Sequence, residues 1–301
     1  SEDPHTESNR IRWWRGFKTP PGERQLLAII ILIGLAVYAI AARMRLLHGA
    51  PSGDEPAYLV LSQAIEKYHS LDVMRVHENQ DYLSYYPGYL DPHVVPGANG
   101  QPEPLHQVGG PVLWLIPFML WERAGAVGFM VVVAVLTLVN IYFFLRERHI
   151  SAPYAFVVTL AMAIGSPIYM LASMTFVEPI GTLTIIFAVR AILMTQLGSG
   201  RLLLASVGLA LAPWVHMRFA PTSLILGLLL LWRVWREHRT RSLWPYVQCL
   251  APLVLSVVLI EIYTIVLYGS VDPMAPQSIY GVSVFDVPLH KGFAGTLFDR
   301  N

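Results

Sequence analysis

The sequence predicts an all-α protein that crosses a membrane several times. Apolar side chains make up 54% of the 301 residues, charged side chains make up only 14%, and the mean hydropathy is +0.50. Water-soluble domains carry about 25% charged residues, so this composition indicates long lipid-facing segments. The single cysteine, Cys249, lies inside an apolar run, which excludes a disulfide framework.

The N-terminal part predicts a basic tail followed by a first membrane helix. Residues 1–24 are polar and rich in arginine, as is typical of a cytoplasmic tail. The apolar residues 26–42 read as the first span, with Arg43 and Arg45 able to reach the lipid headgroups at its far end. A cleaved signal peptide is the alternative, but the apolar run exceeds the usual length of about 7–15 residues.

Residues 46–123 are predicted to form a long first extracytoplasmic loop that carries juxtamembrane helices. A helix is expected over residues 56–68, and turn-rich aromatic sequence follows it. The apolar run 111–121 is too short to span comfortably, because 11 residues at a rise of about 1.5 Å each cover little more than half of a core about 30 Å thick. We expect this run to lie in the membrane interface.

Six further apolar runs complete a predicted module of seven crossings over residues 25–269. With residues 111–121 in the interface, the arginine clusters that begin at Arg146, Arg201 and Arg233 all lie on the side of the basic tail. Pro213 predicts an unwound end for one short run. Residues 270–301 are expected to be extracytoplasmic and to stop before further helices. The six runs are 124–145, 154–172, 179–197, 202–215, 222–235 and 243–267.

Two adjacent carboxylates, Asp54 and Glu55, follow the first predicted span. Neighbouring residues of a helix point about 100° apart, so we expect different roles for the two side chains. One would point into a cavity, and the other would orient it, hold an acceptor or cap the following helix. Asp54 also occupies an N-cap position, with Pro56 suited to the first turn, so simple capping by Asp54 stays open.

Two charged residues, Glu178 and Arg218, lie near the predicted outer boundary of the membrane. Ionisable groups at this depth are costly, so they are candidate functional residues. The Arg218 guanidinium suits a phosphate, because it is planar and stays protonated. The alternatives for Arg218 are an extended position at the headgroups or an ion pair with Glu178 or Glu261.

Several histidines map to the same predicted side and could bind a divalent ion such as Mg²⁺ or Mn²⁺ together with Asp or Glu. None has the close spacing of a ligand motif, so the sequence permits a metal without indicating one. Nucleotide-binding and nucleic-acid signatures are missing from the sequence, so we expect no nucleic-acid partner. The histidines are His48, His69, His77, His93, His106, His216 and His290.

Taken in order, these features resemble the membrane glycosyltransferases with the GT-C fold, which include protein O-mannosyltransferases, the lipid A aminoarabinose transferase and oligosaccharyltransferases. The resemblance covers about residues 26–270. It also includes a predicted short helix after Pro104-Leu105-His106. Three motifs carry the resemblance: Gly53-Asp54-Glu55-Pro56-Ala57-Tyr58, Phe176-Val177-Glu178-Pro179 and Pro213-Trp214-Val215-His216-Met217-Arg218.

The resemblance implies inverting transfer of a sugar from a polyprenyl-phosphate donor to a hydroxyl of a glycan, lipid or protein. Transfer would occur on the extracytoplasmic face of the plasma (inner) membrane. Asp54 would be the catalytic base, Glu55 its companion and Glu178 a second acid of the cavity. Because the lipid phosphate leaves without protonation, positive charge should stabilise it. The expected substrate- and phosphate-binding residues are Arg218, His216, Lys291, His106 and Tyr58.

Two other classes of function remain compatible with the sequence. A transporter or lipid flippase would also place Glu178, Glu261 and Arg218 near membrane depth, but the chain lacks the internal repeat expected of many transporters. A non-catalytic membrane scaffold would keep the helices and tolerate loss of Asp54. Activity of variants at Asp54 therefore discriminates among the three classes.

Overall fold

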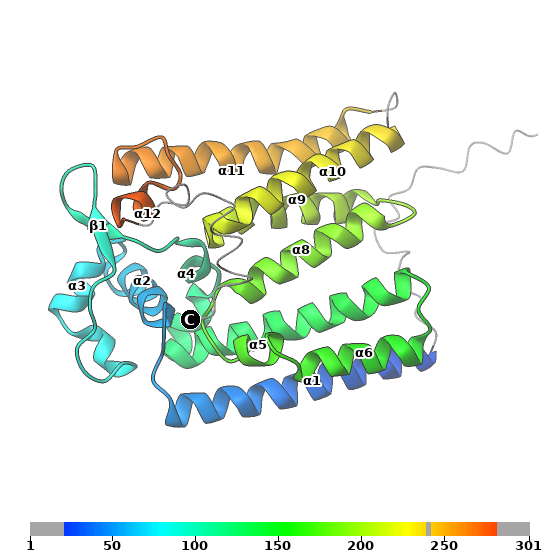
Figure 1. Cartoon of the computed structure of the whole chain (residues 1–301), viewed down its shortest axis with the longest axis horizontal. Helices are drawn as coiled ribbons and strands as arrows, with labels where there is room; N and C mark the ends of the chain where they lie inside the picture. Colours follow the sequence, from blue (N-terminus) through cyan, green and yellow to red (C-terminus); the bar gives the residue numbers. More distant parts are fainter. Residues whose placement is uncertain (1–20, 239–241, 282–301) are drawn as a thin grey trace, which may run out of the picture.

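The computed structural model describes residues 21–238 and 242–281, and these residues form a helical bundle with a loop region at one end (Figure 1). The bundle helices run lengthwise beside one another, and neighbouring helices are in contact. They are α1 (Pro21–His48), α5 (Leu115–Glu147), α6 (Ala152–Ile164), α8 (Glu178–Leu193), α9 (Ser199–Val215), α10 (Ala220–His238) and α11 (Trp244–Tyr268).

The loop region gathers short elements at the left end of the bundle in Figure 1, which we call the loop end. A two-stranded antiparallel hairpin pairs Val94 with Pro104. Two short elements, α7 (Ile168–Leu171) and the 3-10 turn η2 (Met217–Phe219), join bundle helices. The loop-end elements are α2 (Glu55–Tyr68), α3 (Val73–Glu78), η1 (Asp81–Ser84), β1 (Val94–Pro96), β2 (Pro102–Pro104), α4 (Gly109–Leu113) and α12 (Ala275–Ile279).

The length and composition of the helices support a protein that crosses a membrane. Within the described residues, four helical segments are long and apolar enough to cross a bilayer: Gly22–His48, Leu115–Glu147, Met217–Glu237 and Trp244–Tyr268. The apolar helices α6 and α9 are shorter. Helix α11 exposes Val257 and Val266 at 60% and 65%. An apolar surface of this kind is stable against lipid and costly in water.

The run 111–121 does not continue straight into the next bundle helix. Trp121 and Glu122 leave the helical conformation, and Glu122 has φ 47° and ψ −133°. The chain folds back so closely that a Cβ atom on Gly125 would lie 1.8 Å from the Pro117 carbonyl oxygen. The last part of the predicted interfacial run therefore packs against the start of the helix that follows.

Some predicted boundaries are wrong. The run 154–172 is interrupted between α6 and α7, because Pro167 has no N–H and disfavours a helical Ser166 before it. In contrast, Pro213 stays inside α9, which remains helical to Val215, so the predicted unwound end is not found. Helix α1, described from Pro21, includes residues 21–24 of the predicted tail.

The bundle end away from the loop region carries a buried charge that is fully paired. Arg190 is 7% exposed, and its Nη2 lies 2.7 Å from an oxygen of Glu147. Its Nη1 donates to the side chain of Asn140. A buried guanidinium needs such partners to offset its desolvation. These polar groups hold α5 and α8 together.

Candidate functional site

A tight turn at the loop end presents Asp54 to solvent. Gly53 has φ +58°, a conformation that favours glycine, and a Cβ there would approach the Phe176 ring at 3.1 Å. Asp54 precedes α2, and its backbone carbonyl accepts from the Tyr58 N–H at 3.2 Å. Its carboxylate makes no capping hydrogen bond and is exposed. The capping role that the sequence left open for this side chain is therefore wrong.

Glu55 points in a different direction and is fully buried. One carboxylate oxygen accepts from the Ser52 N–H at 3.0 Å and pairs with Arg45 Nη2 at 2.5 Å. The other accepts from the Thr175 N–H at 2.9 Å. Arg45 thus has an ionic partner and does not simply extend to the headgroups. Because both oxygens are engaged within the protein, the geometry fits the orienting role that was one of the alternatives for Glu55 as the companion of Asp54.

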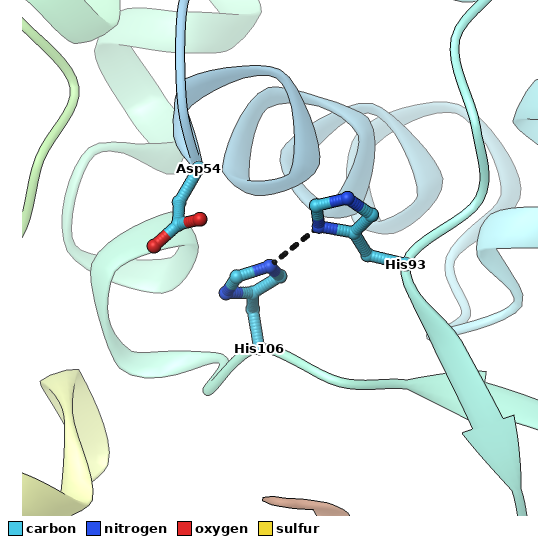
Figure 2. A group of neighbouring side chains, drawn as sticks. All are labelled: Asp54, His93 and His106. Carbon is cyan, nitrogen blue, oxygen red and sulfur yellow. Dashed lines mark hydrogen bonds between the residues drawn. The ribbon is translucent and has the colours of Figure 1, made fainter. Parts of the chain in front are cut away.

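The β1–β2 hairpin brings two histidines to Asp54. His93 and His106 flank the two strands, and Leu105 N–H donates to the His93 carbonyl at 3.0 Å. Their rings stack with centroids 5.4 Å apart, and His93 Nδ1 lies 3.1 Å from His106 Nε2. Ligand-capable atoms of Asp54, His93 and His106 all lie within 4.8 Å of one another (Figure 2). These three residues form the Asp54 cluster.

The surroundings of His106 favour its neutral form. Burial lowers the pKa of the His106 imidazole to about 4, with the negative charge of Asp54 opposing the shift and His93 and His216 adding to it. A neutral imidazole keeps one nitrogen lone pair for accepting a hydrogen bond or binding a metal ion. The cluster therefore combines an exposed carboxylate with a neutral nitrogen ligand.

Tyr58 supports the cluster from behind. Its ring lies 5.0 Å from the His106 ring and 6.2 Å from Trp114, measured between centroids. The residue is only 1% exposed, and burial, strengthened by the charges of Asp54 and Glu178, raises the pKa of its hydroxyl. The expected substrate contact of Tyr58 is not supported, because neighbouring side chains cover the ring. Tyr58 instead fixes the position of His106.

Glu178 and Arg218 meet beside this cluster. Glu178 begins α8, Arg218 lies in η2, and their side chains pair at 2.6 Å while remaining 34% and 47% exposed. This pair is one of the alternatives that the sequence left open for Arg218. The second oxygen of Glu178, Oε2, is buried and has no hydrogen-bond partner among the described residues.

The His216 side chain binds the backbone of the turn that carries Arg218. Its Nδ1 accepts a hydrogen bond from the Arg218 N–H at 3.2 Å. Burial lowers the pKa of the His216 imidazole, the charge of Arg218 lowers it further, and Glu178 and Asp54 oppose the shift. Charges at Asp54, Glu178 and Arg218 thus act on the same small region.

A cavity of about 320 Å³ opens beside the Asp54 cluster. His93 and His106 both line it, so the cluster stands at its wall. Its polar and aromatic lining can bind a small hydroxyl-bearing molecule through hydrogen bonds and ring contacts. The other polar or aromatic side chains of the lining are Ser52, His77, Tyr86, Tyr89 and Asp91.

The structure thus gathers most of the sequence-predicted residues at the loop end, with different roles. Asp54, His106, Glu178, Arg218 and His216 lie near one another, whereas Lys291 falls outside the described residues.

His93 was one of the seven histidines considered as metal ligands from the sequence, but its direct contact with His106 was not predicted. The available signal is the turn at Gly97-Ala98-Asn99-Gly100, which indicates a hairpin; in the observed register His93 lies opposite Leu105, the residue before His106.

Comparisons with known proteins identify no relative. No protein-family model matches the chain, and neither a curated protein nor a solved structure is significantly similar to it. Its function is therefore inferred from the residues of the site.

Proposed function

We propose that this protein is a membrane glycosyltransferase of the GT-C type, which transfers a sugar from a polyprenyl-phosphate donor to a hydroxyl acceptor with inversion. The observation that carries the proposal is the exposed carboxylate of Asp54 at one end of an apolar helical bundle. It lies beside the two histidines that line the cavity, and its charge and that of Arg218 both act on the His216 imidazole. A transferase of this class needs a base and a phosphate-binding cation in one place.

The proposed topology has seven crossings, formed by α1, the part of α5 after Glu122, α6 with α7, α8, α9, α10 and α11. The reversal at Trp121 and Glu122 supports this count, because it separates the run 111–121 from the span that follows. The N-terminal tail is then cytoplasmic, and the loop end is extracytoplasmic, at the plasma (inner) membrane. This orientation agrees with the excess of arginine on the opposite side.

The proposed reaction is a single displacement at the anomeric carbon of the donor. A carboxylate oxygen of Asp54 takes the proton of the acceptor hydroxyl while that oxygen forms a bond to the anomeric carbon. The bond from this carbon to the phosphate oxygen breaks, and its electron pair leaves with the lipid phosphate. Attack from the face opposite the phosphate inverts the anomeric centre.

Arg218 is proposed to stabilise the leaving phosphate. Its guanidinium carries five N–H donors, and the contact with Glu178 leaves others free to bind phosphate oxygens. Glu178 holds the side chain at the edge of the site, and the His216 ring nitrogen holds the backbone of the same turn. Glu178 therefore acts through Arg218 in this proposal, and the acceptor is a glycan, lipid or protein hydroxyl.

The test is transfer from a panel of radiolabelled polyprenyl-phosphate sugars to membrane acceptors by the purified protein in nanodiscs. We expect Asp54→Asn to lower the transfer rate by about 10²–10⁴-fold, the usual contribution of a general base, while donor binding persists. Glu78→Gln is the matched control, because it converts another exposed carboxylate of the same loop region.

Other outcomes separate the competing functions. Equal transfer by the wild type and Asp54→Asn contradicts the role of Asp54. Movement of the labelled lipid across the bilayer without transfer identifies a flippase instead. If the protein binds neither donor nor acceptor and moves no lipid, a scaffold is the remaining explanation.

A further inference from the structure

The Asp54 cluster has a feature that the proposed reaction does not use: two imidazole nitrogens face each other beside a carboxylate. We propose that Asp54, His93 and His106 form a binding site for a divalent transition-metal ion, with Zn²⁺ as the best match. The site itself follows from the geometry of these three side chains and does not depend on the proposed transferase activity.

The spacing of the nitrogens fits shared coordination of one ion. Zinc binds imidazole nitrogen at about 2.0–2.1 Å, so two such ligands at a tetrahedral angle lie about 3.3 Å apart. His93 Nδ1 and His106 Nε2 are 3.1 Å apart. The Asp54 carboxylate lies within 4.8 Å of both nitrogens, close enough for a rotation of its side chain to complete a three-ligand set.

The two histidines are held in place before any ion binds. They flank the paired strands β1 and β2, and the His93 carbonyl accepts from the Leu105 N–H. Tyr58 packs against the ring of His106. The hairpin fixes the backbone at both histidines, Tyr58 restricts the His106 ring and the His93 ring stacks on it, so ion binding requires little further ordering.

The ligand types decide which ion is preferred. Two imidazole nitrogens and one carboxylate oxygen suit Zn²⁺ and related transition metals, whereas Mg²⁺ prefers oxygen ligands and retained water. Three protein ligands with an open fourth position are also typical of catalytic zinc sites. From the sequence, Mg²⁺ and Mn²⁺ were considered. The ligand set of the Asp54 cluster disfavours Mg²⁺ and favours Zn²⁺.

The open coordination positions have space in front of them. His93 and His106 line the cavity of about 320 Å³, so an ion between them could accept a ligand from that side. If the proposed transferase function holds, this ligand is the acceptor hydroxyl. A bound ion would lower the pKa of such a hydroxyl, and the Asp54 oxygen that does not hold the ion would accept its proton.

Metal binding is tested on the tag-free 301-residue chain in detergent, after treatment with a chelator. Isothermal titration with ZnCl₂, MnCl₂ and MgCl₂ compares the ions directly. We expect one tight Zn²⁺ site, weaker Mn²⁺ binding and no detectable Mg²⁺ binding at that site. X-ray absorption at the zinc edge should show two imidazole nitrogens at about 2.0–2.1 Å.

Variants assign the site. His93→Ala and His106→Ala should each weaken Zn²⁺ binding at least about 100-fold, and Asp54→Asn at least about 10-fold, because loss of even an outer-shell partner often costs 10–100-fold. His77→Ala is the matched control, since His77 lines the same cavity but is not one of the three clustered residues. Its Zn²⁺ affinity should equal that of the wild type.

Two results would overturn the proposal: no Zn²⁺ binding by the wild type, or tight binding that is unchanged in all three variants. If His106→Ala does not fold, His93→Ala and the zinc-edge spectrum of the wild type still decide the question. The two proposals fail separately. Zinc binding without sugar transfer removes only the transferase, and Asp54-dependent transfer by a protein that binds no zinc removes only the metal site.

Discussion

The two sides of the first turn of α2 differ sharply, although Asp54 and Glu55 are adjacent in the sequence. Glu55 faces the bundle, has no exposed surface and accepts hydrogen bonds from the Thr175 and Ser52 N–H groups. Asp54 faces solvent beside two histidines and makes no capping hydrogen bond. One carboxylate attaches the loop region to the bundle, and the other is left available for chemistry.

This difference shows how a rigid site is built at the end of a membrane bundle. A side chain can act on a substrate only if other residues hold its backbone. The ion pair of Glu55 with Arg45 ties the start of α2 to the end of α1. Further along the same face of α2, Ser62 accepts a hydrogen bond from the buried Trp114. The following predictions test this division of roles, from the largest expected effect to the smallest.

Replacing Glu55 should destabilise the protein most. Glu55→Gln removes the charge that pairs with Arg45. It also replaces one of the two accepting oxygens with an NH₂ group, which cannot accept a hydrogen bond. Breaking a buried ion pair from one side costs about 3–5 kcal/mol. We expect a loss of this size in the free energy of unfolding, measured by denaturant titration in mixed micelles.

Asp54→Asn provides the contrast for this measurement. Because its carboxylate is exposed and uncapped, its effect on the unfolding free energy should stay within about 0.5 kcal/mol. Similar losses in both variants would show that the two carboxylates do not have separate roles.

Substitution of Trp114 tests a second contact on the buried face of α2. Trp114 has no exposed surface, and its Nε1–H donates to Ser62 Oγ at 2.9 Å. Trp114→Phe removes this donor and leaves space beside Ser62, so we expect a loss of about 2 kcal/mol in the same unfolding assay. Trp121→Phe makes the same change at a residue that is 66% exposed and should have almost no effect. Equal effects would contradict the assignment of Trp114 to the core of the loop region.

The smallest expected effect is a shift in the pKa of His216, which lies beside the partly exposed pair of Glu178 and Arg218. The charge of Arg218 lowers the pKa of His216, and Glu178 raises it. Arg218→Ala removes the positive charge and releases Glu178 from its ion pair, so both changes should raise the His216 pKa. NMR titration of ¹³C-labelled histidine measures this shift. Arg218→Lys keeps the charge and should leave the pKa close to the wild-type value; a fall in Arg218→Ala would contradict the described geometry.

Much of the helical organisation could be predicted from the sequence, because apolar runs in a membrane protein directly record the lengths of its helices. The predicted helix 56–68 corresponds to α2, and the run 243–267 corresponds to α11. The errors occurred at prolines. Pro167 interrupts a predicted run, whereas Pro213 is accommodated within α9. Neighbouring helices decide which outcome a proline has, and a linear pattern does not contain that information.

The candidate site was only partly predictable for a related reason. Asp54, His106, Glu178, Arg218 and His216 were expected at one end of the bundle, and the structure brings them there. The contact between His93 and His106 was not expected, because it depends on the register of a short hairpin. The buried position of Tyr58 likewise depends on packing against Trp114, which comes from a distant part of the chain.

By itself, the sequence determined that this chain is a helical membrane protein with an acidic pair after its first apolar helix. Composition and run length are local properties, and the low solubility of apolar side chains in water turns them directly into helices that face lipid or one another. Only the tertiary structure decided which carboxylate is buried, which histidines meet and which charges pair. Those outcomes depend on distances between residues far apart in the chain, because burial and ion pairing are set by all the elements that pack around a group.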